Sequence, residues 1–181
     1  MSSKPSSLKT KLGENMKNRK ILYLTQAALI AALYVALTWL SNLFGLASGA
    51  VQIRISEALC ILPAFMPGAI FGLFVGCLLS NLSMGSNIFD IIFGSLATLI
   101  GAIITSRIKN KFLAPIPAVI SNTIIVPIVI MLCYTAKEAR TLSTYLLTTV
   151  GVFVGEVISA YILGIILYVA LEKRKNIFKQ K

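Results

Sequence analysis

Long apolar runs that recur along the chain limit most strongly what this sequence can fold into. A helix rises about 1.5 Å per residue, so a run of about 20 apolar residues crosses the ~30 Å hydrocarbon core of a bilayer. Hydrophobic residues make up 57% of the 181 positions and charged residues only 13%, which is too few to cover a water-facing surface. The sequence therefore predicts a multi-pass membrane protein. It excludes a soluble enzyme, a disordered chain and a disulfide-rich secreted domain.

Six apolar segments predict an all-α membrane protein with six transmembrane helices. The second segment is too short for a full crossing unless residues 50–56 contribute to it. Before it, Val51, Ile53 and Ile55 alternate with polar residues, and this period of two predicts an extended outer loop between the first two helices. The predicted helices cover residues 21–45, 57–66, 68–84, 87–106, 113–134 and 145–171.

Lysine and arginine predict the orientation, because they concentrate on the cytoplasmic side of membrane proteins. Six crossings place both termini and the 107–111 loop on one side, which then holds 14 of the 17 basic residues. We therefore predict a protein of the cell membrane with a basic cytoplasmic tail over residues 1–20. This tail is expected to form a short helix near the membrane. A six-helix substrate-binding domain over 21–171 and a second basic tail over 172–181 follow. The net charge of +11 then reflects topology, and nucleic acid is not an expected partner.

Residue types that the chain lacks argue against catalysis. Histidine is absent, which removes histidine-ligated metal sites and the commonest general base. The three cysteines lie in apolar runs without a C-x-x-C spacing, as reduced space-filling thiols do. The chain has no phosphate-binding loop of the form GxxxxGK[ST], so it cannot use ATP alone. We predict that the chain is not an enzyme and binds no metal or cofactor. Any ATP would be consumed by partner subunits.

Acids inside predicted helices mark the candidate site, because a charge at the centre of a bilayer costs about 3 kcal/mol or more. Glu156 lies about eleven residues into the last helix, ~16 Å deep and near the midplane. Asp90 opens the fourth helix, where an acid also suits the helix dipole, and Glu57 opens the second. Arg54 precedes Glu57 by three residues, and a local ion pair between the two is the plain alternative to a binding role.

Uncharged polar residues lie at similar depths. Asn81 ends the third helix on the outer side, Asn122 lies midway along the fifth, and Tyr34 and Trp39 lie in the outer half of the first. An interfacial aromatic belt explains Trp39 equally well. The cytoplasmic half is almost purely apolar. This asymmetry predicts one polar pocket that opens outward above a closed floor, and it argues against a channel, which needs polar lining in both halves.

Small residues at four-residue spacing predict helix contacts, because close backbone approach drives packing in lipid. Such stripes most often pack against other helices of the same chain. On the first predicted helix, a docking face for a partner helix is the alternative interpretation. Ala27 and Ala31 form a second row of alanines on that helix, beside the row listed below. The stripes are Gly68, Gly72, Gly76 and Ser80; Gly151, Gly155 and Ser159; and Ala28, Ala32 and Ala36.

Two stretches resemble a known family. They are Gln52-Ile-Arg-Ile-Ser-Glu-Ala-Leu59, followed by Leu62-Pro63 and Pro67-Gly68, and Asn87-Ile-Phe-Asp-Ile-Ile-Phe-Gly-Ser95. With the alanine-rich first helix and the basic tail, the chain resembles the substrate-binding S components of energy-coupling factor (ECF) transporters. Its closest resemblance among them is to the queuosine-precursor subfamily, QueT. The resemblance covers roughly residues 17–175.

The resemblance implies a mechanism and partners. An S component captures a micronutrient from outside, docks through an alanine face (here Ala28, Ala32 and Ala36) on a transmembrane coupling subunit, and is driven by two ATPase subunits. It is thought to topple in the membrane to release its substrate. The implied substrate is a 7-deazaguanine such as preQ1 or queuine, whose donor edge and cationic aminomethyl group suit several carboxylates.

The expected substrate site follows from this chemistry. Glu156 would accept the donor edge, while Asp90 or Glu57 would face the cation. Asn81, Asn122, Asn87 and Arg54 would supply further polar contacts, and Tyr34, Trp39 or Tyr161 a stacking face. Three alternatives stay open: an S component for a different vitamin or nucleobase-like micronutrient, a non-catalytic membrane assembly protein, and an intramembrane enzyme.

Overall fold

The computed structural model describes the backbone of residues 5–46 and 51–173, and the side chains of residues 15–46 and 51–173. Within these ranges the chain contains helices and no strand. The predicted outer loop lies partly outside the described residues, at 47–50. The same holds for the predicted tails, at 1–4 and 174–181.

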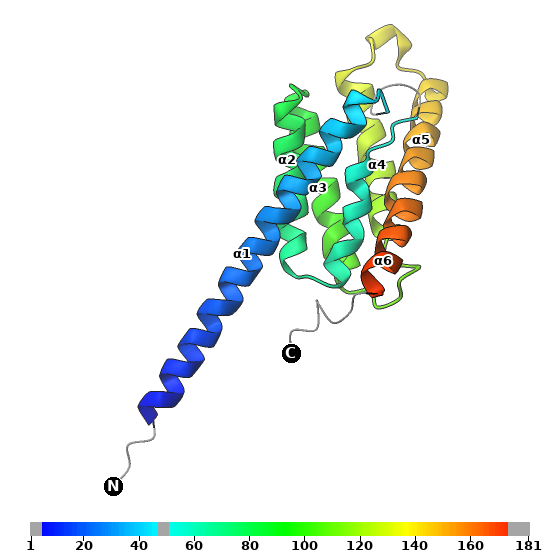
Figure 1. The fold of residues 1–181 in the computed structure, drawn as a ribbon. Coiled ribbons are helices and arrows are strands. Elements are labelled where there is room, and N and C mark those ends of the chain that lie inside the picture. Colours follow the sequence, from blue (N-terminus) through cyan, green and yellow to red (C-terminus); the bar gives the residue numbers. More distant parts are fainter. Residues whose placement is uncertain (1–4, 47–50, 174–181) are drawn as a thin grey trace.

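The described residues contain six α-helices, which form one bundle (Figure 1). Two short 3₁₀ helices, η1 (Ile55–Ala64) and η2 (Lys137–Ala139), and a π-helical segment, η3 (Val157–Leu163), lie between them. The α-helices are α1 (Pro5–Leu43), α2 (Gly68–Ser83), α3 (Ile88–Thr105), α4 (Ile116–Cys133), α5 (Leu142–Glu156) and α6 (Gly164–Glu172).

Among the residues that the structure describes, four helical stretches are long and apolar enough to cross a membrane: Asn15–Leu43, Ile88–Thr105, Ile116–Cys133 and Leu142–Glu172. The chain is therefore an all-helical, multi-pass membrane protein, as predicted. Helix α2 and η1 are apolar but shorter, so the six-span topology stays a prediction. The first turns of α1, the last turns of α6 and the 106–115 loop lie at one end of the molecule (Figure 1). Their placement on the cytoplasmic side also stays a prediction.

The predicted N-terminal tail and the predicted last helix differ from the structure. The polar segment before residue 21 was expected to be a tail with only a short helix, but α1 runs without interruption from Pro5. That segment contains no proline after Pro5, and most of its residues are adequate helix formers. The predicted last helix begins at Leu142, where the Thr141 side chain caps the backbone N–H of Thr144, and it contains a π-helical turn directly after Glu156.

The shortest predicted helix forms the centre of the bundle. Segment η1 is wound as a 3₁₀ helix, starts two residues earlier than predicted and buries every residue from Ser56 to Pro63. It packs against α1, α2, α3, η3 and α6. Because it is enclosed by other helices, η1 does not need the length of a full crossing.

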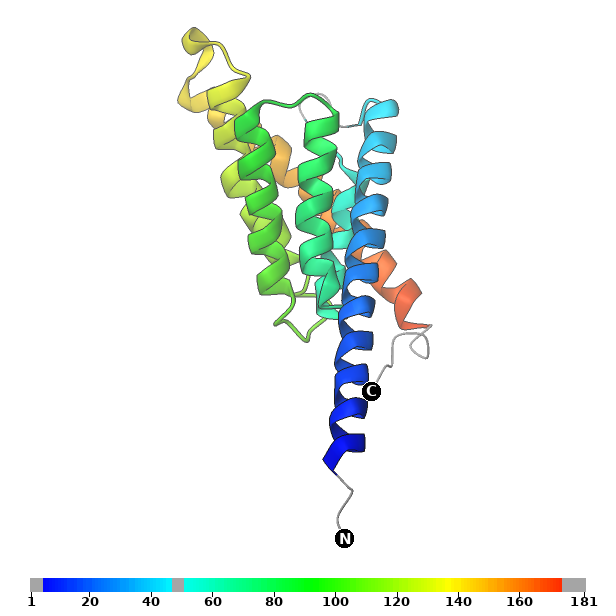
Figure 2. The ribbon, with the colours of Figure 1, turned by 90° about the vertical axis from the view of Figure 1, so that its left-hand side faces the viewer.

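Helices α1, α2 and α3 lie side by side as one layer (Figure 2). The contact between α1 and α2 is made by the glycine stripe of α2 and one alanine register of α1. A Cβ atom on Gly72 would lie 2.7 Å from the backbone oxygen of Ala27, and one on Gly76 would lie 2.7 Å from Cβ of Tyr34. Ala27 and Ala31 are buried in this contact. The prediction that the α2 stripe packs against a helix is confirmed.

Gly72→Ala is expected to lower the thermal stability of the purified protein, because the new methyl group meets backbone that cannot rotate away. Overpacking of this kind costs about 1–3 kcal/mol. Gly164→Ala is the matched control, since its Cβ would lie 3.6 Å from Ala58 oxygen, an ordinary contact. Equal melting temperatures for the two variants, measured in the same detergent, would contradict the close α1–α2 contact.

Candidate functional site

A small polar cavity lies among η1, the segment before it, and helices α2 to α5. It lies toward the end of the bundle away from the 106–115 loop, and its free volume is about 20 Å³, room for one water molecule. Its lining contains three acids and one arginine. The lining residues are Gln52, Arg54, Glu57, Cys77, Asp90, Gly94, Thr98, Asn122, Val126, Val152 and Glu156.

Glu57 is the most enclosed of the three acids. Its Oε1 accepts a hydrogen bond from the hydroxyl of Tyr34, and its Oε2 accepts from Sγ of Cys60 at 3.0 Å. The side-chain amide of Asn122 lies 3.4 Å from the same Oε2. Glu57 is therefore held from three sides by α1, η1 and α4, and its position in the cavity is fixed.

Asn122 joins two carboxylates. Its Nδ2 donates to Oε1 of Glu156 at 3.0 Å while it also approaches Glu57. The second oxygen of Glu156, Oε2, is buried and has no hydrogen-bond partner among the described residues. A buried acceptor without a donor costs free energy unless a bound molecule supplies the donor. Glu156 thus offers an unused acceptor at the cavity.

Arg54 bonds to an asparagine rather than to an acid. Its Nη1 donates to Oδ1 of Asn81 at 3.2 Å, and Nδ2 of Asn81 lies 3.6 Å from Sγ of Cys77. Within the described residues, Arg54 and Glu57 form no ion pair. The local pair considered from the sequence is therefore wrong, because the extended backbone at Arg54 directs its side chain to α2 while Glu57 faces α1 and α4.

Asp90 lies where α3 begins. Its Oδ2 accepts from the hydroxyl of Tyr134 at 3.1 Å, and that hydroxyl also accepts from the backbone N–H of Asn87. The side chain of Asn87 caps α3 by accepting from the N–H of Phe89. Asn87 is exposed and lies outside the cavity lining. It fixes the start of the helix that carries Asp90.

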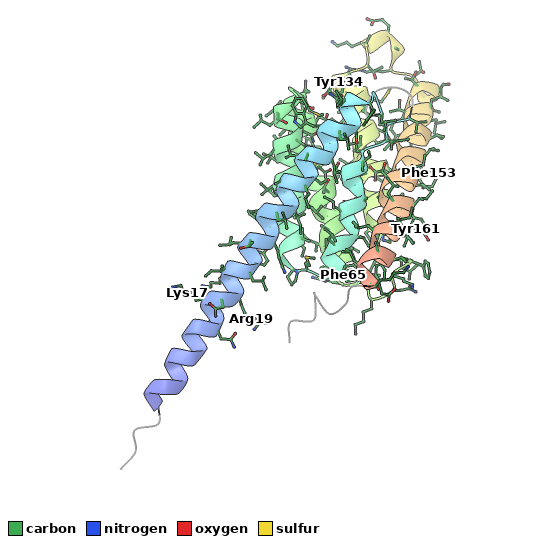
Figure 3. All side chains as sticks on the ribbon, in the orientation of Figure 1. Lys17, Arg19, Phe65, Tyr134, Phe153 and Tyr161 are labelled. Atoms are coloured by element: carbon green, nitrogen blue, oxygen red, sulfur yellow. The ribbon has the colours of Figure 1, made fainter. Side chains whose placement is uncertain are left out.

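None of the three candidate aromatic residues lines the cavity. Tyr34 is fully buried behind Glu57. Trp39 is exposed, and its indole N–H donates to Ser83 at 3.1 Å. Tyr161 is partly buried against the core and lies in the part of the α5–α6 helix nearer to Phe65 than to Tyr134 (Figure 3). The structure therefore brings together Arg54, Glu57, Asp90, Asn122 and Glu156, with Asn81 directly behind Arg54.

Sequence reasoning missed several lining residues. Asp90, Gly94 and Thr98 are four residues apart on α3 and share one face, a spacing that could have identified Thr98. Gln52 enters because its backbone packs on Gly155, where a Cβ would lie 2.0 Å from the Gln52 oxygen. Gly155 was expected to face another helix. Instead, the absence of a side chain at Gly155 lets the backbone of Gln52 pack there, over the cavity.

The two alanine registers of α1 have different environments. Ala27 and Ala31 are buried against α2, whereas Ala28, Ala32 and Ala36 are exposed. The second register forms a smooth outer strip on α1 that no described part of this chain covers.

Comparison with known proteins identifies the family of this chain. The sequence profile of the QueT transporter family matches residues 24–173. The chain belongs to the QueT transporter family. Membership in a transporter family favours transport over catalysis.

One curated relative of this QueT-family chain is the queuosine precursor transporter QueT of Lactococcus lactis subsp. cremoris (strain MG1363). The two are 33% identical over 101 residues, which cover 54% of this chain and 59% of that protein. The match thus spans about three-fifths of the relative's length. No solved structure matches the QueT-family chain significantly.

Proposed function

We propose that this chain is the substrate-binding S component of an ECF importer and captures a 7-deazaguanine queuosine precursor. Its family and its relative's name support the substrate class. The observation that carries the proposal is the buried, unpartnered Oε2 of Glu156, beside Asn122 and Glu57. This arrangement suits a ligand rich in hydrogen-bond donors.

The substrate class supplies those donors. The base has a ring N–H and an exocyclic amine side by side, and a carboxylate can accept both. In our assignment Glu156 accepts this edge, while Arg54, once released from Asn81, donates to the ring carbonyl. A second acid then faces the cationic aminomethyl group of preQ1. Three acids against one arginine in the lining suit a cationic, donor-rich ligand better than an anionic vitamin.

Binding requires the cavity to widen, because its present volume of about 20 Å³ holds one water and not a bicyclic base. The residues that cover the cavity from outside a helix are those before η1. Gln52 rests on Gly155 by backbone contact, and the side chain of Arg54 is tied by one hydrogen bond, to Asn81. The backbone hydrogen bonds of this segment are those from Ile53 N–H to Leu46 oxygen and from Glu57 N–H to Arg54 oxygen. In our proposal the substrate therefore enters the cavity when residues 51–54 move outward. Glu57 and Asn122 stay in place as the rigid floor.

The partners follow from the ECF assignment. The exposed strip of Ala28, Ala32 and Ala36 docks on a transmembrane coupling subunit, and two ATPase subunits supply the energy. The protein resides in the cell membrane with both termini in the cytoplasm. The cavity then opens to the outside, at the end opposite to the 106–115 loop.

Binding to the purified full-length chain tests the function. Isothermal titration should show preQ1 bound more tightly than guanine, with thiamine and riboflavin not bound. Guanine lacks the aminomethyl cation that the second acid would face, so it is the closest control. Tight binding of either vitamin without binding of preQ1 would leave the transporter family intact and overturn the 7-deazaguanine assignment.

A further inference from the structure

A second, larger hollow lies outside the polar site, on the surface between α3 and α4. Its volume is about 420 Å³, within the range of small-molecule pockets. Isoleucines dominate its walls, including Ile100 and Ile104 from α3 and Ile116, Ile120 and Ile124 from α4. The hydroxyl of Ser121 donates to its own helix, at the oxygen of Ala118, so it offers no free donor to an occupant.

The hollow has the length of one membrane leaflet. Ile116 and Ile124 are eight residues apart on α4, or about 12 Å along the axis. Half of the hydrocarbon core is about 15 Å thick. The hollow begins beside the 106–115 loop, since Ile108 and Leu113 complete its wall there. It therefore runs from one membrane surface toward the midplane, as an acyl chain does.

Unpaired basic residues stand at the end of the hollow that meets the membrane surface. Arg107 and Lys109 are exposed, and neither forms an ion pair within the described part of the chain. Lys111, in the same loop, is already engaged, with Nζ 3.4 Å from Oε2 of Glu172 and above the ring of Tyr168. The two exposed cations thus flank Ile108 in the sequence, and Ile108 lines the hollow.

We propose that this groove binds one anionic phospholipid, with an acyl chain between α3 and α4 and the phosphate on Arg107 and Lys109. Guanidinium and ammonium groups both bind phosphate through charge-assisted hydrogen bonds. The proposal does not depend on the substrate of the polar cavity. It assigns the bound lipid to the end of the bundle that carries the basic loop.

Native mass spectrometry of the purified full-length protein tests the groove. The probes are dioleoylphosphatidylglycerol and dioleoylphosphatidylcholine, which share acyl chains and differ in net charge. The wild-type chain should retain one phosphatidylglycerol in preference to phosphatidylcholine. Arg107→Gln combined with Lys109→Gln should reduce that preference by about thirty-fold, as expected for two surface charges. Lys137→Gln, a basic residue at the other end of the bundle, should leave it unchanged.

Filling the groove is the second arm. Ile120→Trp places a large side chain in the wall and should reduce retention of both lipids, whereas Ile128→Trp, exposed on α4 outside the wall, should not. Equal phosphatidylglycerol retention in the charge variants and their control would overturn the proposal. So would an Ile120→Trp variant that retains lipid normally but fails to assemble with a coupling subunit, since a protein helix would then occupy the groove.

Discussion

Glu156→Gln is expected to raise the dissociation constant for preQ1 by about 100-fold or more. The glutamine keeps the size of the side chain but removes the negative charge and replaces one acceptor oxygen by a donor. Hydrogen bonds to a charged group contribute about 1.5–3 kcal/mol each, and two adjacent donors of the base would lose this acceptor. Titration of the purified variant with preQ1 measures the loss, and uptake by cells expressing it should fall in parallel.

The same variant should be at least as stable as the wild type without ligand. Glu156 carries a buried oxygen that no described donor satisfies, and neutralising the group removes part of that cost. Without ligand, the melting temperature of the variant should therefore equal or exceed that of the wild type. Addition of preQ1 should raise the melting temperature of the wild type but not that of the variant. Misfolding would instead lower the melting temperature.

Glu138→Gln is the matched control, because Glu138 is an exposed acid on η2 outside the cavity lining. It should bind preQ1 as the wild type does. If Glu156→Gln also kept wild-type affinity, Glu156 would be removed from the site, and the unpartnered oxygen would need another explanation.

The membrane character and most helix positions could be predicted from hydrophobic runs, because lipid permits few alternatives to a helix. The acids could be found for a related reason: Glu57 and Glu156 are expensive in an apolar environment, so their presence alone singles them out. Their convergence with Asn122 required only the correct depth along each helix.

Other features depend on tertiary contacts that local patterns do not carry. The central position of η1 could not be read from its ten residues, since an apolar segment of that length suits either a core or a partial crossing. Trp39 and Tyr161 were assigned to the site by residue type, but Trp39 is exposed and Tyr161 packs against the core outside the cavity lining. Gly155 was expected to contact another helix. A glycine in the sequence indicates that some backbone approaches closely, but it does not indicate which one.

Ala32→Trp is expected to reduce uptake strongly while leaving ligand binding intact. Ala32 is exposed on the outer strip of α1, so the larger side chain meets nothing within the described chain. A helix of a coupling subunit that packs closely on this strip would be held away by the indole, and close packing is the main source of helix association in lipid. Transport by reconstituted complexes should fall at least about tenfold, with the dissociation constant for preQ1 changed less than about twofold.

Leu96→Trp is the control, an exposed apolar position on α3 rather than on α1. It should assemble and transport normally. The contrast between the two variants separates an S component from a transporter that works alone. A self-sufficient carrier has no reason to be blocked at an exposed surface outside the cavity lining. Full transport by Ala32→Trp would exclude the α1 strip as the docking face, and transport by the isolated chain without ATPase subunits would exclude the ECF mechanism itself.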